Sequence, residues 1–349
     1  MTDGRLDRIC IVMMSAVGDT VHVLPLVNAI KRQHPSSHIT WVLQPGPATL
    51  VRGHPAVDEV IVFDRSKGLR AFREVISELR ARDFDVLINL QAYLKAGIIT
   101  ALSGTRRRIG FDRARAPDAN WLFTTERIPA RGERHVQEQY FEFLEQLGVE
   151  PEPAEWRLGP WDTEREWQRE FMSQFDRPIA AVVVAASNAA RDWAPERIAE
   201  VCDILSEQYD VQPVLVGGDS PKERDVVARI MSRTRSKPVS MLGSGLRKLV
   251  SILDASALVI SPDTGPLHIS VALNKPVIAL MGVTDSRRTG PWRHFDDLIV
   301  DTFNDPDEPA PISKKRVSAA KSGDGMARIS VADVVKKLEI WNKRYRGKS

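Results

Sequence analysis

The sequence Ala257–Val271, ALVISPDTGPLHISV, decides the fold of this chain. Its apolar residues Leu258–Ile260 predict a buried strand that ends within two residues of the run. Asp263 or Thr264 can then cap a helix. Pro266 suits the first helical turn, where its missing N–H group costs nothing. The stretch is therefore expected to be a strand that passes tightly into a helix.

Such a junction points free backbone N–H groups at a ligand from the positive end of the helix dipole, which suits a pyrophosphate. Gly265 allows a ligand to approach the backbone closely. Thr264 and His268 offer a hydroxyl and an imidazole on the same side. An ordinary capped strand–helix junction explains the spacing equally well, because a single motif match is weak evidence.

Composition and length limit the classes of protein that this chain can represent. Of its 349 residues, 43% are hydrophobic and 27% are charged, which indicates a globular protein with room for two domains. The longest apolar run, Ile179–Ala186, is too short to span a membrane, and we recognise no signal peptide. Cys10 and Cys202 are expected to be reduced, packed thiols. No Cys/His cluster has metal-ligand spacing, so we expect neither a metal nor a cofactor.

Strand and helix patterns alternate along the whole chain. Strands are expected at 8–14, 38–43, 59–63, 85–89, 106–110, 179–186, 212–216, 258–260 and 276–280, and helices at 21–33, 69–82, 93–102, 134–147, 163–174, 195–208, 221–233, 246–254, 267–273 and 331–341. This alternation favours parallel sheets with right-handed crossovers, in two doubly wound domains. The proline-bearing, aperiodic segment 150–160 is the expected linker, and 301–324 is expected to be irregular.

A second candidate loop, Ser15–Asp19, joins the first expected strand to the first expected helix, where ligands bind in such folds. Its single glycine, Gly18, leaves the dinucleotide fingerprint incomplete, which disfavours a nicotinamide-dependent dehydrogenase. Asp19 is either a plain helix cap or a general base within reach of a hydroxyl group. A helix N-terminus stabilises a carboxylate and so weakens it as a base, unless another contact offsets this effect. His22 lies three residues further on, on the same helix face.

A basic cluster is expected in the first domain. Its arginines are Arg106, Arg107, Arg108, Arg113 and Arg115, to which Lys95 and Arg65 could add. The cluster is either a solvated loop or a surface for an acidic, phosphorylated glycolipid, because arginine clamps phosphate and carboxylate groups with paired hydrogen bonds. Phe111 is the single aromatic residue among these arginines and the net charge is only +3, so nucleic acid is disfavoured as a partner.

Several motifs in this order resemble glycosyltransferase family 9, the heptosyltransferases of lipopolysaccharide core assembly. The chain reads SAVGDTVHVLP at Ser15–Pro25 and DTGPLH at Asp263–His268, and Pro276–Trp292 continues the similarity. Arg191–Arg197, RDWAPER, resembles the basic-x-Trp-Pro segment of the family, and His135 begins a helix that resembles the one closing its first domain. The resemblance covers most of the chain.

The resemblance implies a GT-B fold, in which two Rossmann-like, doubly wound α/β domains face a cleft. An acceptor-binding domain is expected at 1–155 and a nucleotide-sugar-binding domain at 156–328, with the helix of 329–349 packing back on the N-terminal domain. The implied reaction is an inverting, metal-independent transfer of heptose from ADP-heptose to a lipopolysaccharide core acceptor, either lipid A–Kdo or heptose. A cytoplasmic enzyme is implied, and an acidic glycolipid acceptor implies peripheral contact with the cytoplasmic face of the inner membrane.

Site residues follow from the matching motif positions and from the basic cluster. Asp19 matches the catalytic base of the family; donor contacts are expected from Arg191, Asp263, Thr264, Gly265 and His268, and acceptor contacts from Ser15, His22, Arg106, Arg107, Arg113 and His135. Gln139 stands where the family often carries arginine, which leaves the acceptor open. Two alternatives remain: a family-9-type transferase with another donor sugar or with a protein or other glycan acceptor, and a non-catalytic binding protein of the same fold.

Overall fold

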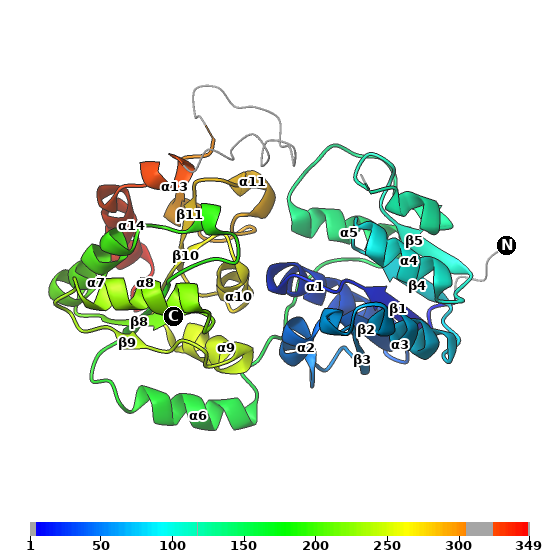
Figure 1. Ribbon diagram of the computed structural model, residues 1–349, viewed down its shortest axis with the longest axis horizontal. Helices are drawn as coiled ribbons and strands as arrows, with labels where there is room; N and C mark the ends of the chain where they lie inside the picture. Colours follow the sequence, from blue (N-terminus) through cyan, green and yellow to red (C-terminus); the bar gives the residue numbers. More distant parts are fainter. Residues whose placement is uncertain (1–4, 117, 305–323, 348–349) are drawn as a thin grey trace. The chain divides into compact units, whose positions relative to one another are not determined.

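The computed structural model describes residues 5–116, 118–304 and 324–347. The chain divides into two compact units (Figure 1), of which the first comprises 1–132 and 136–158 and the second 133–135 and 159–349. Each unit is built on a six-stranded sheet, and every strand pairing is parallel. The division falls between Leu158 and Gly159, within the segment where we expected the linker.

The first unit has the strand order β3-β2-β1-β4-β5-β6. Its strands are β1 Arg8–Val12, β2 His38–Leu43, β3 Glu59–Val62, β4 Val86–Asn89, β5 Arg107–Gly110 and β6 Glu126–Arg127. Its helices are α1 Val17–Gln33, α2 Pro45–Val51, α3 Leu69–Arg80, α4 Leu94–Leu102 and α5 Val136–Leu147, with 3-10 turns η1 Arg65–Lys67 and η2 Asn120–Phe123.

Helices cover both faces of the first sheet. On β1, Cys10 and Val12 belong to the apolar cluster that α3 and α4 complete. Their neighbours Ile9 and Ile11 point to the opposite face, because side chains alternate along a strand, and they are equally buried. Such two-sided burial explains why the strands of this unit read as continuous apolar runs.

The second unit has the strand order β12-β11-β10-β7-β8-β9. Its strands are β7 Ile179–Val183, β8 Gln212–Val216, β9 Val239–Ser240, β10 Leu258–Pro262, β11 Val277–Met281 and β12 Ile299–Asp301. Its helices are α6 Asp162–Met172, α7 Pro195–Tyr209, α8 Pro221–Met231, α9 Leu246–Ala255, α10 Gly265–Ala272, α11 Ser286–Thr289, α13 Asp324–Arg328 and α14 Val331–Arg344, with 3-10 turns η3 Ala189–Arg191 and η4 Asp296–Leu298. Residues 305–323 of the expected irregular segment lie outside the described residues.

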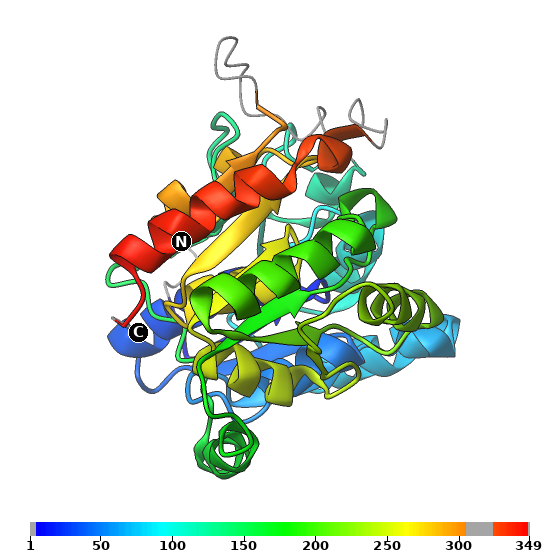
Figure 2. The ribbon, with the colours of Figure 1, turned by 90° about the vertical axis from the view of Figure 1, so that its left-hand side faces the viewer.

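The last helix packs on the second unit. Val334, Leu338 and Trp341 of α14 are buried in the same apolar cluster as α7 and the second sheet, and the indole of Trp341 donates to the carbonyl of Ala257 at 3.0 Å. Figure 2 shows α14 in red beside the strands of this sheet. The apolar face of this helix is thus covered within its own unit, and its packing on the N-terminal domain stays a prediction.

Two helix boundaries in the first unit also differ from expectation. Helix α1 begins at Val17 rather than at Val21, since the carboxylate of Asp19 accepts a hydrogen bond from the Ala16 N–H at 2.9 Å and closes the first turn. Helix α2 occupies a stretch for which we expected neither a strand nor a helix. Its prolines lie in the first turn, where proline is compatible with a helix.

Candidate active site

In each sheet the strand order reverses next to the first strand of the unit. The reversal lies between β1 and β4 in the first unit and between β7 and β10 in the second. Ligands of open parallel sheets bind at this point, outside the carboxyl ends of the strands. Asp19 follows β1, whereas Arg191 follows β7 and Asp263 follows β10. The expected base and the expected donor residues therefore lie at the two binding positions that the topology defines.

The Asp19 carboxylate is oriented by two donors. Its Oδ2 atom accepts from the Ala16 N–H at 2.9 Å, and the hydroxyl of buried Tyr140, on α5, lies 3.5 Å from Oδ1. Asp19 itself is partly exposed. Hydrogen bonds from fixed donors hold the carboxylate in one orientation and favour its ionised form. An oriented, ionised and accessible carboxylate has the properties that a base toward a bound hydroxyl group needs.

A buried glutamine holds the loop that carries Ser15. The side-chain oxygen of Gln91 accepts from the Met14 N–H at 3.1 Å, while its side-chain nitrogen donates to the Ser15 carbonyl at 2.9 Å. Gln91 follows β4, so it ties the carboxyl ends of the two strands at the reversal together. We did not single out Gln91 from the sequence, because only the pairing of β1 with β4 brings it to this loop.

His22 is clamped by a second glutamine. The Gln137 side chain donates to the His22 carbonyl at 2.8 Å, which fixes the amide so that its oxygen lies 3.0 Å from the imidazole Nδ1 atom. An amide oxygen only accepts, so Nδ1 carries a proton. Both residues are buried. These two hydrogen bonds link α5 to α1, and the Nδ1 atom of His22 has a structural role.

Two arginines of the basic cluster are held in ion pairs. The Nε atom of Arg107 lies 3.0 Å from a carboxylate oxygen of Glu126. The side chain of Arg115 is buried, ion-paired to Asp112, and lies 2.8 Å from a carboxylate oxygen of Glu142. Buried charges are stable only when they are paired in this way. Arg115 therefore has a structural role in the first unit.

The remaining arginines of the cluster do not share one surface. Arg106 precedes β5 and Arg113 follows it, so they lie at the amino and the carboxyl end of this strand. Both are exposed. Only Arg113 lies at the edge that carries Asp19. The prediction of one continuous basic cluster is wrong, because a strand separates residues that are close in sequence.

The donor-side residues form a compact charged group. Asp263 is buried; its carbonyl accepts from Arg191 at 2.8 Å, and its Oδ2 atom lies 3.5 Å from the same guanidinium. The His268 imidazole lies 3.4 Å from Oδ1, and the Thr289 hydroxyl donates to Oδ2 at 3.1 Å. Burial alone would raise the pKa of Asp263, but the His268 hydrogen bond and the Arg191 charge together lower it well below its usual range. Asp263 is therefore an ionised internal anchor.

The start of α10 is left open to a ligand by this arrangement. Thr264 occupies the N-cap position without a side-chain capping bond, and Asp263 is directed to its charged partners instead. Thr264 and Gly265 are partly exposed. The helix N-terminus and the tethered guanidinium of Arg191, 28% exposed, lie around the same aspartate. Together they form an anion site that suits a diphosphate.

His135 belongs to the second unit, and its contact with an acceptor stays a prediction. Its Nε2 atom donates to the Gly290 carbonyl at 3.0 Å, and its ring lies 6.5 Å from that of Trp292. Burial lowers the pKa of His135 to about 4, although the bond to Gly290 opposes this shift. The imidazole is therefore neutral near pH 7. Among the residues that the structure describes, no three His, Cys, Asp or Glu side chains gather where a metal ion could be held.

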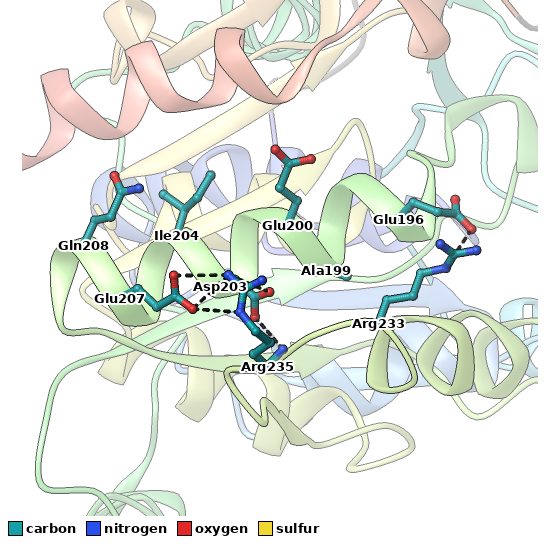
Figure 3. A pocket seen from close by; sticks show the side chains of 9 residues that line it. All are labelled: Glu196, Ala199, Glu200, Asp203, Ile204, Glu207, Gln208, Arg233 and Arg235. Atoms are coloured by element: carbon teal, nitrogen blue, oxygen red, sulfur yellow. Dashed lines mark hydrogen bonds and ion pairs between the residues drawn. The ribbon is translucent and has the colours of Figure 1, made fainter.

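A separate surface groove contains none of these site residues. It has a volume of about 560 Å³ and lies along α7 and the chain after α8 (Figure 3). Its charges are largely paired with one another: Arg235 lies 3.0 Å from Glu207, and Arg233 lies 3.6 Å from Glu196. Asp203, at its centre, accepts from the Thr234 hydroxyl at 2.6 Å. This groove is a surface ion-pair network.

Two doubly wound units, each with polar and charged residues at its strand reversal, define a two-domain α/β protein that binds ligands at the carboxyl ends of its strands. The chain belongs to glycosyltransferase family 9 (heptosyltransferase), whose family model matches residues 72–311. It is 28% identical over 292 residues to the lipopolysaccharide core heptosyltransferase OpsX of Haemophilus influenzae, with 83% of each chain covered. The resemblance seen in the motifs is confirmed.

Solved structures support the fold. The glycosyl transferase family 9 structure from Veillonella parvula is similar with a TM-score of 0.82 and 23% identity, over 96% of this chain and 97% of that one. The structure of E. coli heptosyltransferase WaaC with ADP-2-deoxy-2-fluoro heptose has a TM-score of 0.71 and 20% identity, over 96% and 99% of the two chains. The expected GT-B class is thereby confirmed. Within the described part of the chain, none of the helices combines the length and apolar character needed to cross a bilayer.

Proposed function

We propose that the protein transfers heptose from ADP-heptose to a lipopolysaccharide core acceptor, with inversion at the anomeric carbon. The observation that carries the proposal is the anion site of the second unit, where Asp263 anchors Arg191 and His268 beside the start of α10. The relatives support the choice of substrate, because OpsX is a lipopolysaccharide core heptosyltransferase and WaaC was solved with a fluorinated ADP-heptose.

The donor's pyrophosphate would bind at the start of α10. The bond between the anomeric carbon and the phosphate oxygen breaks during transfer, so negative charge grows on the departing ADP. Arg191 and the N-terminus of α10 are fixed donors for that charge, and fixed donors need no reorganisation during the reaction. Before the donor binds, the Asp263 carboxylate neutralises the positive charge of Arg191 and holds its guanidinium in place.

Asp19 would act as the general base. The acceptor hydroxyl attacks the anomeric carbon from the face opposite the nucleotide, and its proton passes to the Asp19 carboxylate. The hydrogen bond from Ala16 weakens the carboxylate as a base but fixes its direction. The attacking oxygen becomes more acidic as it bonds to carbon, so a modest base that is already ionised is sufficient.

Acceptor contacts are proposed at the same edge of the first unit. Ser15 is partly exposed beside Asp19, and Arg113 is exposed at the end of β5. No carboxylate of the described residues pairs with Arg113 in the structure, and its guanidinium lies 4.9 Å from the ring centre of Trp121. A guanidinium of this kind suits a phosphate or a carboxylate of an acidic glycolipid.

A substrate comparison tests the proposal. The full chain is incubated with ADP-heptose and a lipopolysaccharide acceptor that lacks heptose, and the product is analysed by mass and by NMR of the new anomeric centre. We expect one heptose to be added with inverted configuration, and no transfer from UDP- or GDP-sugars. Transfer with retention, or a preference for another nucleotide, would overturn the donor or the mechanism. Transfer only to a protein acceptor would keep the chemistry and replace the acceptor.

A further inference from the structure

Large apolar side chains are exposed at the start of helix α4. Tyr93 is 57% exposed, Leu94 46% and Leu122 59%. They are three of the six large hydrophobic side chains that the described residues expose, the others being Leu69, Leu102 and Met231. We call Tyr93, Leu94 and Leu122 the apolar patch. Single exposed apolar residues are ordinary, whereas a group of them marks an interaction surface.

The two segments that carry the patch are fastened together. The side-chain nitrogen of Asn120, the first residue of η2, donates to the Tyr93 carbonyl at 2.8 Å, and its oxygen accepts from Asn89 at 2.9 Å. One turn into α4, a methyl group added to Gly97 would lie 2.4 Å from the Phe123 ring, so helix and turn are in close contact. The apolar patch is thus a fixed feature of the first unit.

Three cations lie next to the apolar patch in the sequence or against the ring of Trp121, which precedes Leu122 in the chain. Lys95 follows Leu94 in the sequence, and Arg113 and Arg127 place their guanidinium groups 4.9 and 5.3 Å from the ring centre of Trp121. All three cations are exposed. Within the described ranges, none of the three forms an ion pair with a carboxylate, in contrast to Arg107 and Arg115 of the same unit.

The combination fits an anionic lipid bilayer better than bulk water. Tyrosine and tryptophan rings favour the headgroup level of a membrane, leucine favours the start of the acyl chains, and lysine and arginine bind anionic headgroups. The exposed carboxylate of Asp118 is the one acidic group in the segment 113–122, apart from the paired Asp112 that precedes it. The segments that carry the patch therefore combine exposed apolar side chains with more exposed cations than carboxylates.

We propose that the apolar patch, with Lys95, Arg113 and Arg127, docks the first unit on an anionic phospholipid bilayer. Tyr93 and Leu94 of the patch follow β4, and Asp19 follows the neighbouring strand β1, so they lie at the same ends of the strands, while Asn120 ties the turn that carries Leu122 to Tyr93. Docking would turn these strand ends toward the membrane. Membrane docking goes beyond the proposed function. It rests on that function only in one respect, because docking would bring the protein to a glycolipid acceptor.

Vesicle flotation of the full chain tests the docking without any sugar substrate. The probes are phosphatidylcholine vesicles with and without phosphatidylglycerol. We expect wild-type protein to bind only the anionic vesicles and to be released by high salt. A Leu94→Ser/Leu122→Ser double variant and a Lys95→Glu/Arg127→Glu double variant should each bind at least about tenfold more weakly. The matched control, Leu69→Ser/Met231→Ser, should bind as the wild type does.

Several outcomes would overturn the docking proposal. The first is the absence of wild-type binding to anionic vesicles, and the second is binding by both double variants at the wild-type level. The third is a leucine-dependent dimer that forms without vesicle binding, which would assign the patch to a second copy of the chain. Thermal unfolding at the wild-type temperature shows that each variant is folded. If the variants lose vesicle binding but keep transfer to a detergent-dispersed acceptor, docking and catalysis are separate. Loss of transfer by wild-type protein would refute the proposed function alone.

Discussion

Replacing Arg191 by alanine removes the only guanidinium that contacts Asp263 among the described residues. Asp263 is 4% exposed and would keep the His268 imidazole at 3.4 Å and the Thr289 hydroxyl at 3.1 Å. Breaking a fully buried ion pair costs about 3–5 kcal/mol. Because Arg191 is 28% exposed and Asp263 keeps two partners, we expect the second unit to lose about 1–2 kcal/mol of unfolding free energy.

The same substitution removes a donor for the departing pyrophosphate. Loss of one preorganised donor of this kind costs roughly 10²–10³ in turnover, or about 3–4 kcal/mol of barrier. Arg191→Lys should recover part of the turnover, since it keeps the charge but loses the forked geometry. Arg224→Ala, which removes an exposed guanidinium paired with Asp219, is the matched control and should behave as the wild type does.

Turnover at saturating ADP-heptose and thermal unfolding are the two readouts. A loss of about 1–2 kcal/mol lowers the Tm of a unit of this size by roughly 2–8 °C. Since Arg191 helps to depress the pKa of Asp263, the stability that Asp263 contributes is present above its ordinary pKa and is lost as the pH falls through the depressed value. In Arg191→Ala the folded-state pKa of Asp263 lies closer to its ordinary value, so that loss should be smaller and should be complete at a higher pH. Unchanged turnover at saturating donor would refute the assignment of Arg191.

Two further predictions concern buried polar contacts. The pKa of His135 is lowered to about 4. The contribution of neutral His135 to the unfolding free energy should therefore be fully present above the ordinary histidine pKa and should decrease as the pH falls from that value toward 4. His135→Gln should remove this dependence when unfolding is measured as a function of pH. Gln137→Leu should destabilise the first unit by about 1–3 kcal/mol, because two hydrogen bonds to His22 are lost, whereas Gln208→Leu on the surface should not; equal unfolding midpoints in denaturant would contradict this.

The architecture was predictable where local signals are strong. Long apolar strands such as His38–Leu43 and Gln212–Val216 have the bounds that the sequence predicts, because strands buried on both faces read as continuous apolar runs. The short strands β6, β9 and β12 were not expected, since two or three residues carry no periodicity. Their strand character comes from pairing with a neighbouring strand rather than from their own residues.

The position of the candidate site was predictable in part. Asp19 and Asp263 could be located because strand–helix junctions have local signatures. Gln91, Gln137 and Thr289 could not, since each reaches its partner across a long stretch of sequence. A cluster of basic residues in the sequence misleads for a similar reason. Residues before and after one strand are close in sequence, but the strand places them at its opposite ends.

The most direct test of the central claim is transfer by Asp19→Asn. The variant keeps the size of the side chain but removes the base, and Asp83→Asn, at an exposed position of the same unit, is the matched control. We expect Asp19→Asn to bind ADP as tightly as the wild type does and to lose heptose transfer by roughly 10²–10⁴, while Asp83→Asn retains both. Transfer by Asp19→Asn at the wild-type rate would contradict the assignment of Asp19 as the general base.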